Sequence, residues 1–179
     1  MCATPSKPKR VALEPAAALA AALRGCLGRF VTGVAVVTFE SPPGNRRGIT
    51  VDSFTSVSLD PPLILVSIAK TARCHDPLAS GCALCVNVLG AEQEVLARAF
   101  ARSREDLAVE RVEGLHAPGL PGVLARFECE PWRCYDGGDH TLVLGRIIDF
   151  TFRDGDALGF YTSRFAPVAD RHLGHEDLI

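Results

Sequence analysis

The chain has 179 residues, of which 47% are hydrophobic and 22% charged, and its formal net charge is −2. A chain of this size can bury a full hydrophobic core as one domain. The 19 Lys and Arg residues are scattered rather than gathered into a basic stripe, which excludes the electrostatic pattern typical of nucleic-acid-binding proteins.

The N-terminal region combines a polar stretch with an alanine-rich one. Residues 1–12 are polar and basic and are predicted to form a flexible tail. The alanine run at 16–22 is too short and too weakly apolar for a membrane span, so we expect a cytoplasmic protein without membrane contact. From residue 14 to about 28 we predict an amphipathic helix that caps another part of the domain. Its apolar residues recur at near-helical spacing: Leu19, Leu23, Leu27 and Phe30.

After Gly28 the sequence changes to β-branched runs separated by turn residues, which is typical of strands. We predict strands at 32–39, 46–54, 56–59, 62–69, 83–89, 125–135, 140–152 and 157–161. The runs 62–69 and 83–89 are almost continuously apolar, which predicts burial on both faces.

Two helical pieces interrupt this series of strands. A loop with a short helix is expected at 71–81, and an amphipathic helix at 91–102 with an apolar face formed by Val95, Leu96, Ala99 and Phe100. This order of elements fits a closed β-barrel with helices on its outside better than an alternating βαβ sheet. We therefore predict one mainly β domain with flanking helices over residues 13–168, followed by a C-terminal tail at 169–179.

The sequence contains seven cysteines, an odd number, and several of them lie inside strand-like runs. Reduced thiols are expected, because a cysteine in such a run acts as a small buried hydrophobe. Cys82 and Cys85 form a single CxxC motif with no second pair or histidine near it. Packing within a strand is therefore favoured over a zinc or redox role.

Three polar clusters at strand ends are candidates for chemistry, since neither the Gly-x-Gly-x-x-Gly nor the Gly-x-Ser-x-Gly motif is present. Residues 48–58 crowd hydroxyl groups into an apolar strand pair, which suits the polar edge of a flat heterocycle but also a solvent-exposed strand. Residues 67–73 place a hydroxyl and two cations after a buried strand, where they could hold a phosphate or remain solvated. In residues 137–140 a histidine follows a flexible turn, where its ring could face a pocket or serve structure.

Six motifs follow one another as they do in the short-chain flavin reductases that serve two-component flavin-dependent monooxygenases. The resemblance runs from about residue 22 to about 165 and is carried by Phe30–Thr38, Gly48–Leu63, Val86–Leu89, Leu96–Ala101, Phe127–Cys129 and Gly138–Thr141. It implies an FMN-binding split β-barrel, usually a homodimer, that reduces FMN or FAD with NADH or NADPH. It also implies a partner monooxygenase that receives the reduced flavin, and a protein that orients the cofactor while the cofactor does the redox chemistry.

The resemblance also implies roles for individual residues. The flavin ring and ribityl chain would be lined by Thr50, Val51, Asp52, Ser53, Phe54, Ser56 and Val57. The phosphate would be held by Thr71, Ala72, Arg73 and Cys74, with Arg104 and Glu105 approaching the rest of the cofactor. The nicotinamide site would contain His140, Arg164 and Phe165.

Asp52 departs from the family pattern, because relatives more often carry Ser or Asn at this position. An ionised carboxylate beside the ring would oppose the negative charge of reduced flavin and lower its potential, unless the side chain points away.

Two other functions remain open from the sequence. One is a flavin-retaining enzyme of the same fold that acts directly on an organic substrate. The other is a non-catalytic flavin- or haem-binding module, against which the retained Gly138-Asp139-His140 argues. FMN and FAD, and NADH and NADPH, remain alternatives.

Overall fold

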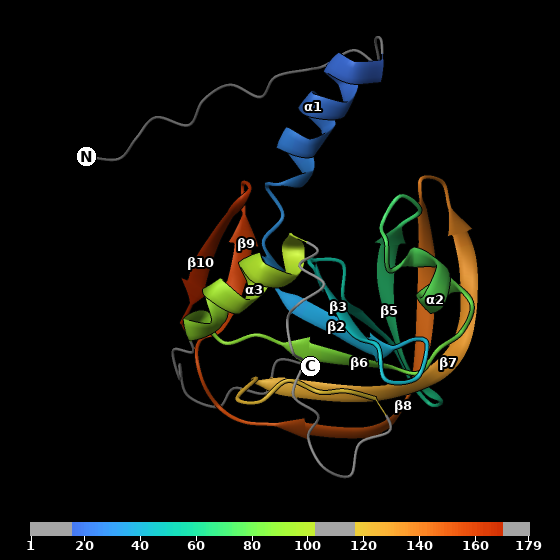
Figure 1. The fold of residues 1–179 in the computed structure, drawn as a ribbon. Coiled ribbons are helices and arrows are strands. Elements are labelled where there is room, and N and C mark those ends of the chain that lie inside the picture. The colour runs from blue at the N-terminus through green and yellow to red at the C-terminus, as the bar shows by residue number, and fades with distance from the viewer. Residues whose placement is uncertain (1–15, 103–116, 170–179) are drawn as a thin grey trace.

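The computed structural model describes residues 16–102 and 117–169 (Figure 1). The main sheet contains β2 (Ala35–Glu40), β3 (Arg46–Val51), β4 (Thr55–Leu59), β5 (Pro62–Ala69), β6 (Leu84–Val88), β7 (Ala125–Gly137) and β8 (His140–Phe152). A small sheet contains β1 (Thr32–Gly33), β9 (Ala157–Tyr161) and β10 (Arg164–Val168). The helices are α1 (Ala16–Leu27), α2 (His75–Ala79), the 3₁₀ helix η1 (Ala91–Gln93) and α3 (Glu94–Ala101). The predicted mainly β class with flanking helices is confirmed.

The main sheet is rolled but not closed. Its antiparallel strands are ordered β3-β2-β6-β7-β8-β5-β4, so β3 and β4 are its two edges. Only Asp52–Phe54 separate these edges along the chain, and the step from Val51 to Thr55 can span at most about 14 Å. The connected ends of the two edge strands must therefore lie close together, although no ladder joins the edges in the described part of the chain. The predicted closure is wrong, and the fold is a barrel with a slit between β3 and β4.

Two hydrophobic clusters explain the continuous apolar runs of the central strands. Side chains alternate between the faces of a strand, and in β2 Val37 faces the inside of the rolled sheet while Val36 faces its outside. The inner cluster also contains Phe39, Val51, Ile64, Val66, Ile68, Leu78, Leu84, Val86 and Val143. The outer cluster contains Val34, Val36, Leu89, Ala97, Phe100, Leu120, Val123 and Leu158. Burial of β6 on both faces, predicted for 83–89, is confirmed.

Helix α3 covers the outside of the sheet next to β3. A Cβ atom on Gly48 would lie 2.6 Å from the ring of Phe100, so the missing side chain at residue 48 makes room for that ring. The predicted apolar face of this helix is partly wrong, because Val95 is 80% exposed whereas Ala97 is buried. The helix begins with the 3₁₀ turn η1, whose tighter winding rotates the buried stripe relative to a regular α-helix.

Helix α1 forms close to where the sequence predicts it, but it projects away from the sheet (Figure 1). Leu27 and Phe30 are 64% and 77% exposed, and Leu23 is exposed too. Its C-terminal end contacts the β9–β10 turn, where the Thr162 amide donates to the Gly28 carbonyl at 2.9 Å. Its exposed residues cover no apolar surface of the described chain, so the capping role of this helix stays a prediction.

Strand β10 was not predicted. The turn before it has positive φ at both Thr162 (47°) and Ser163 (63°), a conformation usually supplied by Asn-Gly or Gly-Gly. The hairpin therefore carries no recognisable turn signal in its sequence. The predicted tail at 1–12, residues 170–179 of the predicted C-terminal tail, Arg104 and Glu105 lie outside the described residues.

None of the described helices is both long and apolar enough to cross a membrane.

Candidate functional site

Two cavities of about 220 Å³ each flank the C-terminal end of β3. The His140 cavity is lined by Ile49, Thr50, Val51, Asp52, Ser53, Ser67, Ile68, Ala69 and His140. The Phe165 cavity is lined by Val34, Thr50, Val51, Asp52, Ala101, Phe160 and Phe165. Thr50, Val51 and Asp52 belong to both walls, so the first polar cluster of the sequence separates two adjoining spaces at the slit of the barrel.

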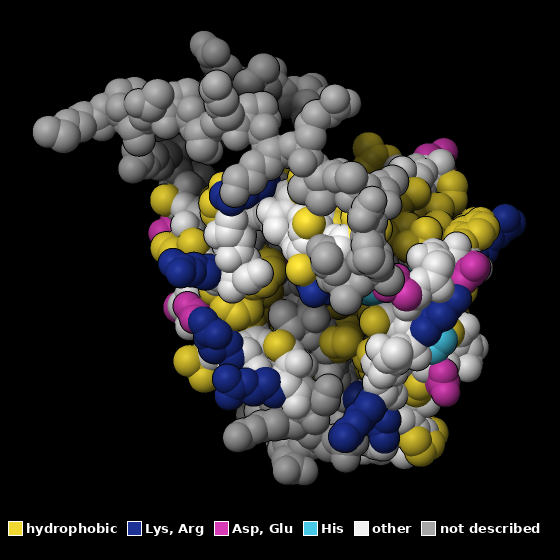
Figure 2. Space-filling view, turned by 90° about the horizontal axis from the view of Figure 1, so that it is seen from above, with side chains coloured by type: hydrophobic (Ala, Val, Ile, Leu, Met, Phe, Trp, Pro, Cys, Tyr) yellow, Lys and Arg dark blue, Asp and Glu magenta, His cyan; other side chains and the backbone are white. Residues whose placement is uncertain are grey.

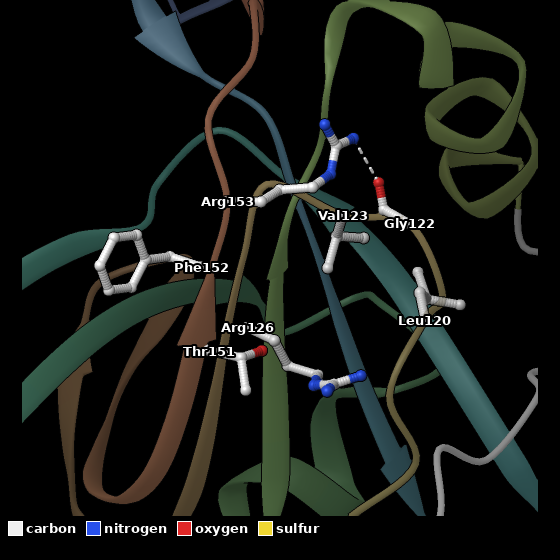
Figure 3. Close-up of a pocket in the computed structure, with 7 residues that line it drawn as sticks. All are labelled: Leu120, Gly122, Val123, Arg126, Thr151, Phe152 and Arg153. Carbon is white, nitrogen blue, oxygen red and sulfur yellow. Dashed lines mark hydrogen bonds between the residues drawn. The ribbon is translucent and has the colours of Figure 1, made fainter.

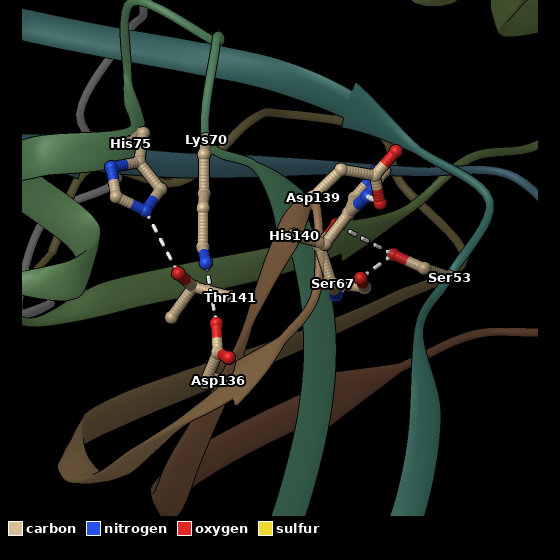
Figure 4. A network of polar contacts seen from close by, with 8 residues as sticks. All are labelled: Ser53, Ser67, Lys70, His75, Asp136, Asp139, His140 and Thr141. Atoms are coloured by element: carbon tan, nitrogen blue, oxygen red, sulfur yellow. Dashed lines mark hydrogen bonds and ion pairs between the residues drawn. The ribbon is translucent and has the colours of Figure 1, made fainter.

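Ser53 fixes the wall of the His140 cavity. Its Oγ accepts a hydrogen bond from the Ser67 amide at 3.0 Å and donates one to the Ser67 carbonyl at 3.1 Å (Figure 4). Ser53 belongs to the β3–β4 connection and Ser67 to β5. A side-chain hydroxyl thus makes the two bonds that a neighbouring strand would otherwise make, and it ties the connection across the slit to the sheet.

His140 is the first residue of β8. It directly follows the two-residue turn Gly138-Asp139, which connects the two strands of the β7–β8 hairpin. Its Nδ1 is 2.7 Å from the Asp139 carboxylate, and its side chain is 41% exposed. The hydrogen bond and the charge of His140 lower the pKa of Asp139 below its usual value. The carboxylate therefore favours a proton on Nδ1 and leaves Nε2 available for another partner.

Three contacts attach the loop after β5 to this hairpin, and Figure 4 draws the two that Lys70 and His75 make through their side chains. The Lys70 amide donates to the Asp139 carbonyl at 2.9 Å, and the Lys70 ammonium pairs with Asp136, which lowers the pKa of Asp136. His75 Nε2 is 2.8 Å from the Thr141 hydroxyl. These contacts hold loop 70–75 against the hairpin that carries His140, and we call the two segments together the loop–hairpin unit. Sequence reasoning missed His75, whose only signal is its position before Asp-Pro at the start of a short helix.

In the space-filling view from above, hydrophobic side chains lie in a hollow of the molecular surface, and Lys and Arg side chains lie around its edges (Figure 2).

Comparisons with known proteins identify the family of this chain. The family described as "Flavin reductase like domain" matches residues 27–169. The chain belongs to this family. The resemblance recognised in the six motifs is thereby confirmed.

Named relatives of this flavin reductase-like domain are reductases. The chain is 43% identical over 145 residues to the FMN reductase (NADH) SmoA of Agrobacterium fabrum, covering 79% of this chain and 82% of that protein. The NADH:FAD oxidoreductase SgcE6 of Streptomyces globisporus, solved with NAD and FAD fragments, superposes with a TM-score of 0.77 at 40% identity. That match covers 84% of this chain and 93% of SgcE6. The styrene monooxygenase flavin reductase from Pseudomonas putida superposes with a TM-score of 0.75 at 34% identity, over 81% of this chain and 95% of that one.

Several residues that the family resemblance places in the flavin site have their side chains engaged elsewhere. Thr50 Oγ1 donates to the Ala97 carbonyl at 2.7 Å, which ties β3 to α3. The Phe54 ring packs against Phe127 at a centroid distance of 5.6 Å, next to the inner core. Cys74 lies in that core, and burial raises the pKa of its thiol. These residues shape the site through backbone and packing.

The remaining predicted residues divide by position. Phe165 lines the Phe165 cavity, and the Arg98 guanidinium lies 4.9 Å from the centre of its ring. Arg73 is exposed on the loop that leads into α2. Eight predicted residues within the described chain line neither cavity: Phe54, Ser56, Val57, Thr71, Ala72, Arg73, Cys74 and Arg164.

A third cavity of about 230 Å³, the Arg126 cavity, shares no residue with the other two (Figure 3). It is lined by Leu120, Gly122, Val123, Arg126, Thr151, Phe152 and Arg153. Arg153 donates to the Gly122 carbonyl at 2.6 Å and pairs with Glu92 at 2.8 Å. None of the predicted site residues lies here, and its ionisable lining is entirely basic.

Proposed function

We propose that this flavin reductase-like protein uses NADH to reduce FMN or FAD and passes the reduced flavin to a flavin-dependent monooxygenase. The chain is an oxidoreductase of the flavin reductase family. NADH is preferred as the donor because SmoA and SgcE6 are both named as NADH enzymes. A monooxygenase partner is supported by the Pseudomonas relative, which is named as the reductase of such a system.

The observation that carries the proposal is the pair of adjoining cavities at the slit. Each measures about 220 Å³, and together they reach the range of about 300–1,000 Å³ common for small-molecule sites. One is bordered by hydroxyl groups and His140, and the other by the rings of Phe160 and Phe165. The two spaces together offer a polar side and an aromatic side, which suits two flat rings, a flavin and a nicotinamide, bound next to one another at the slit.

Bound flavin supplies the redox chemistry by accepting a hydride, which is two electrons and one proton, from NADH, which leaves as NAD⁺. Ser53 and Ser67 hold the shape of the His140 cavity. We assign to His140 the positioning of the nicotinamide, through donation to its carboxamide or phosphates.

The flavin contacts are proposed by position. Residues 50–54, with Ser56 and Val57, flank the ring and ribityl chain. Thr71–Cys74 hold the phosphate, with Arg73 supplying charge, and Arg104 and Glu105 approach the rest of the cofactor. Arg164 and Phe165 complete the nicotinamide side.

A second copy of the chain is the proposed partner of the exposed apolar residues. These residues lie on α1 and just after it (Leu23, Leu27, Phe30 and Val31) and on the β7–β8 hairpin (Trp132, Tyr135, Ile148, Phe150 and Phe152). Large exposed apolar patches mark interaction sites. We expect a C2 homodimer that buries more than roughly 2,000 Å² in total, and sedimentation that shows a monomer at micromolar concentration would contradict it.

We also propose a cytoplasmic location. It is supported by the six cysteines in the described residues, all of which are free thiols, as expected in a reducing compartment.

The function is tested by adding FMN or FAD to the purified protein and following NADH or NADPH oxidation without any other substrate. We expect flavin-dependent turnover with NADH and a yellow complex. Arg73→Ala should weaken flavin binding by about 1–3 kcal/mol, because it removes a charged hydrogen-bond donor to phosphate. Unmeasurable flavin binding would refute the proposal, whereas turnover only with an added organic substrate would favour the flavin-retaining enzyme.

A further inference from the structure

Asp52 occupies an unusual position, on the wall shared by the two cavities. It follows directly after β3, and its side chain is exposed. It is the only acidic residue among the described residues that line either cavity. Whichever cavity receives the flavin ring, Asp52 belongs to the wall of that cavity.

Within the described residues, no neighbour neutralises the negative charge of Asp52. In residues 16–102 and 117–169 the structure gives its carboxylate no hydrogen bond or ion pair, and no Lys or Arg lines either cavity. The acids of the nearby hairpin differ, since Asp136 pairs with Lys70 and Asp139 with His140. Among the ionisable groups facing the cavities, only His140 could offset Asp52, and its Nδ1 already contacts Asp139.

Flavin changes charge at its ring when it is reduced. The oxidised ring is neutral, whereas the two-electron reduced ring readily loses a proton near neutral pH and becomes an anion. The phosphate charge is the same in both states and cancels when their affinities are compared. A carboxylate beside the ring therefore repels the product more than the substrate.

We propose that Asp52 discriminates between the two redox states of flavin, weakening the binding of reduced flavin relative to oxidised flavin so that the product is released. This inference rests on the proposed function, since it requires flavin in these cavities. A reductase that serves a separate oxygenase gains from such a difference, because oxidised flavin enters and reduced flavin leaves through the same site.

The expected size follows from the exposure of the site. For charges roughly 5–6 Å apart in a medium between protein surface and bulk water, the ratio of the two dissociation constants should change by about three- to thirtyfold. Because the carboxylate is solvated, the effect should shrink as salt is added.

The test is an anaerobic titration of the protein with oxidised FMN and with dithionite-reduced FMN, at low and high ionic strength. Asp52→Asn keeps the size of the side chain and removes its charge, and Asp52→Glu restores the charge. The matched control is Asp154→Asn, which removes one charge from an exposed residue that lines neither cavity.

In Asp52→Asn we expect the Kd for reduced FMN to fall about three- to thirtyfold while the Kd for oxidised FMN changes less than about threefold. The midpoint potential of bound flavin should rise by about 30 mV for each tenfold change in the ratio. Asp52→Glu and Asp154→Asn should retain the wild-type ratio.

Three outcomes separate the possibilities. An unchanged ratio in Asp52→Asn, with normal flavin binding, would overturn this inference and leave the proposed function intact. An equal change in both dissociation constants would also overturn it, because it would show an effect on cavity shape. Failure of the wild-type protein to bind either form would instead refute the proposed function.

Discussion

Two clusters of polar residues in this protein are made of similar residue types, but one is buried in the core and the other is in contact with solvent. The buried polar cluster consists of Thr38, Cys85, Asn87 and Glu128, all almost fully inaccessible. The cavity polar cluster consists of Asp52, Ser53, Ser67, Asp139 and His140, all of which retain contact with solvent. Both contain hydroxyl, acidic and amide or imidazole groups, so residue type alone does not separate them.

The buried polar cluster organises the fold. Asn87 Nδ2 donates to the Val36 carbonyl and the Thr38 hydroxyl at 2.9 Å each, and Asn87 Oδ1 accepts from the Leu120 amide at 2.9 Å. Glu128 Oε1 accepts from the Ala117 amide at 2.9 Å. These bonds hold residues 117–120 against the sheet and satisfy backbone groups that would otherwise be buried without partners.

The difference teaches that burial converts a polar motif from a binding role to a structural one. Removing a partner from a buried network leaves its other members unsatisfied, whereas a half-exposed group can turn to water. Mutations in the first cluster should therefore affect stability, and mutations in the second should affect ligand binding and turnover.

The largest expected effect is that of Asn87→Ala. It removes several buried hydrogen bonds and should lower the free energy of unfolding by about 2–4 kcal/mol, measured by urea denaturation. Activity per folded molecule should change little. The matched control, Asn45→Ala in the exposed turn before β3, should change stability by less than about 0.5 kcal/mol. Equal effects of the two variants would break the comparison.

His140→Ala should have the opposite effect to Asn87→Ala, lowering activity while leaving stability nearly unchanged. We expect kcat/KM for NADH to fall by roughly ten- to a hundredfold, which is about 1.4–2.7 kcal/mol of transition-state stabilisation, with flavin affinity and melting temperature nearly unchanged. Steady-state kinetics and thermal denaturation measure both. If the variant loses stability or flavin while turnover per bound flavin persists, His140 is structural and the nicotinamide site is to be sought at Arg164 and Phe165.

Alkaline pH should lower the stability of the protein through two buried thiols, those of Cys85 in the buried polar cluster and Cys129 in the inner hydrophobic cluster. Burial raises the pKa of Cys85 from 9.0 to about 12, and that of Cys129 likewise. The unfolded chain therefore loses these protons first, so the stabilisation is complete below pH 9 and is lost as the pH rises from 9 toward 12. Near pH 9.5 we expect a loss of about 1 kcal/mol per thiol.

Urea denaturation at pH 8 and pH 9.5 tests this expectation. Cys85→Ala should reduce the pH dependence even though it lowers stability at both pH values. An unchanged pH dependence in Cys85→Ala would show that other groups cause the alkaline loss.

Ser53→Ala should show the smallest effect and mark the boundary between the two clusters. Loss of its two bonds to Ser67 should cost about 0.5–1.5 kcal/mol of stability, because both backbone groups of Ser67 remain only partly buried. Flavin binding should weaken as well, since the bridge shapes the His140 cavity. Ser41→Ala, in the turn before β3 and on a residue that lines neither cavity, is the control. A loss of stability without any change in flavin affinity would show that Ser53 has a structural role only.

Much of this architecture follows from local sequence patterns. Alternating or continuous apolar runs predict every strand of the main sheet, and helical spacing predicts α1 and α3, because these patterns depend on residues close together in the chain. The order of the motifs also predicts the flavin reductase family. Strand β10 escapes prediction because Thr162 and Ser163 form a turn without glycine or asparagine.

The sequence by itself thus determined every strand of the main sheet, the helices α1 and α3, the family and most of the residues eligible for the site. Only the tertiary structure decided the slit between β3 and β4, the exposure of α1 and the division of polar residues between core and cavity. Asn87 is buried because its amide meets Val36, 51 residues earlier, and His140 lies beside Ser53 and Ser67 because β5 pairs with β8. Burial arises from pairing between distant segments, so local residue patterns do not encode it.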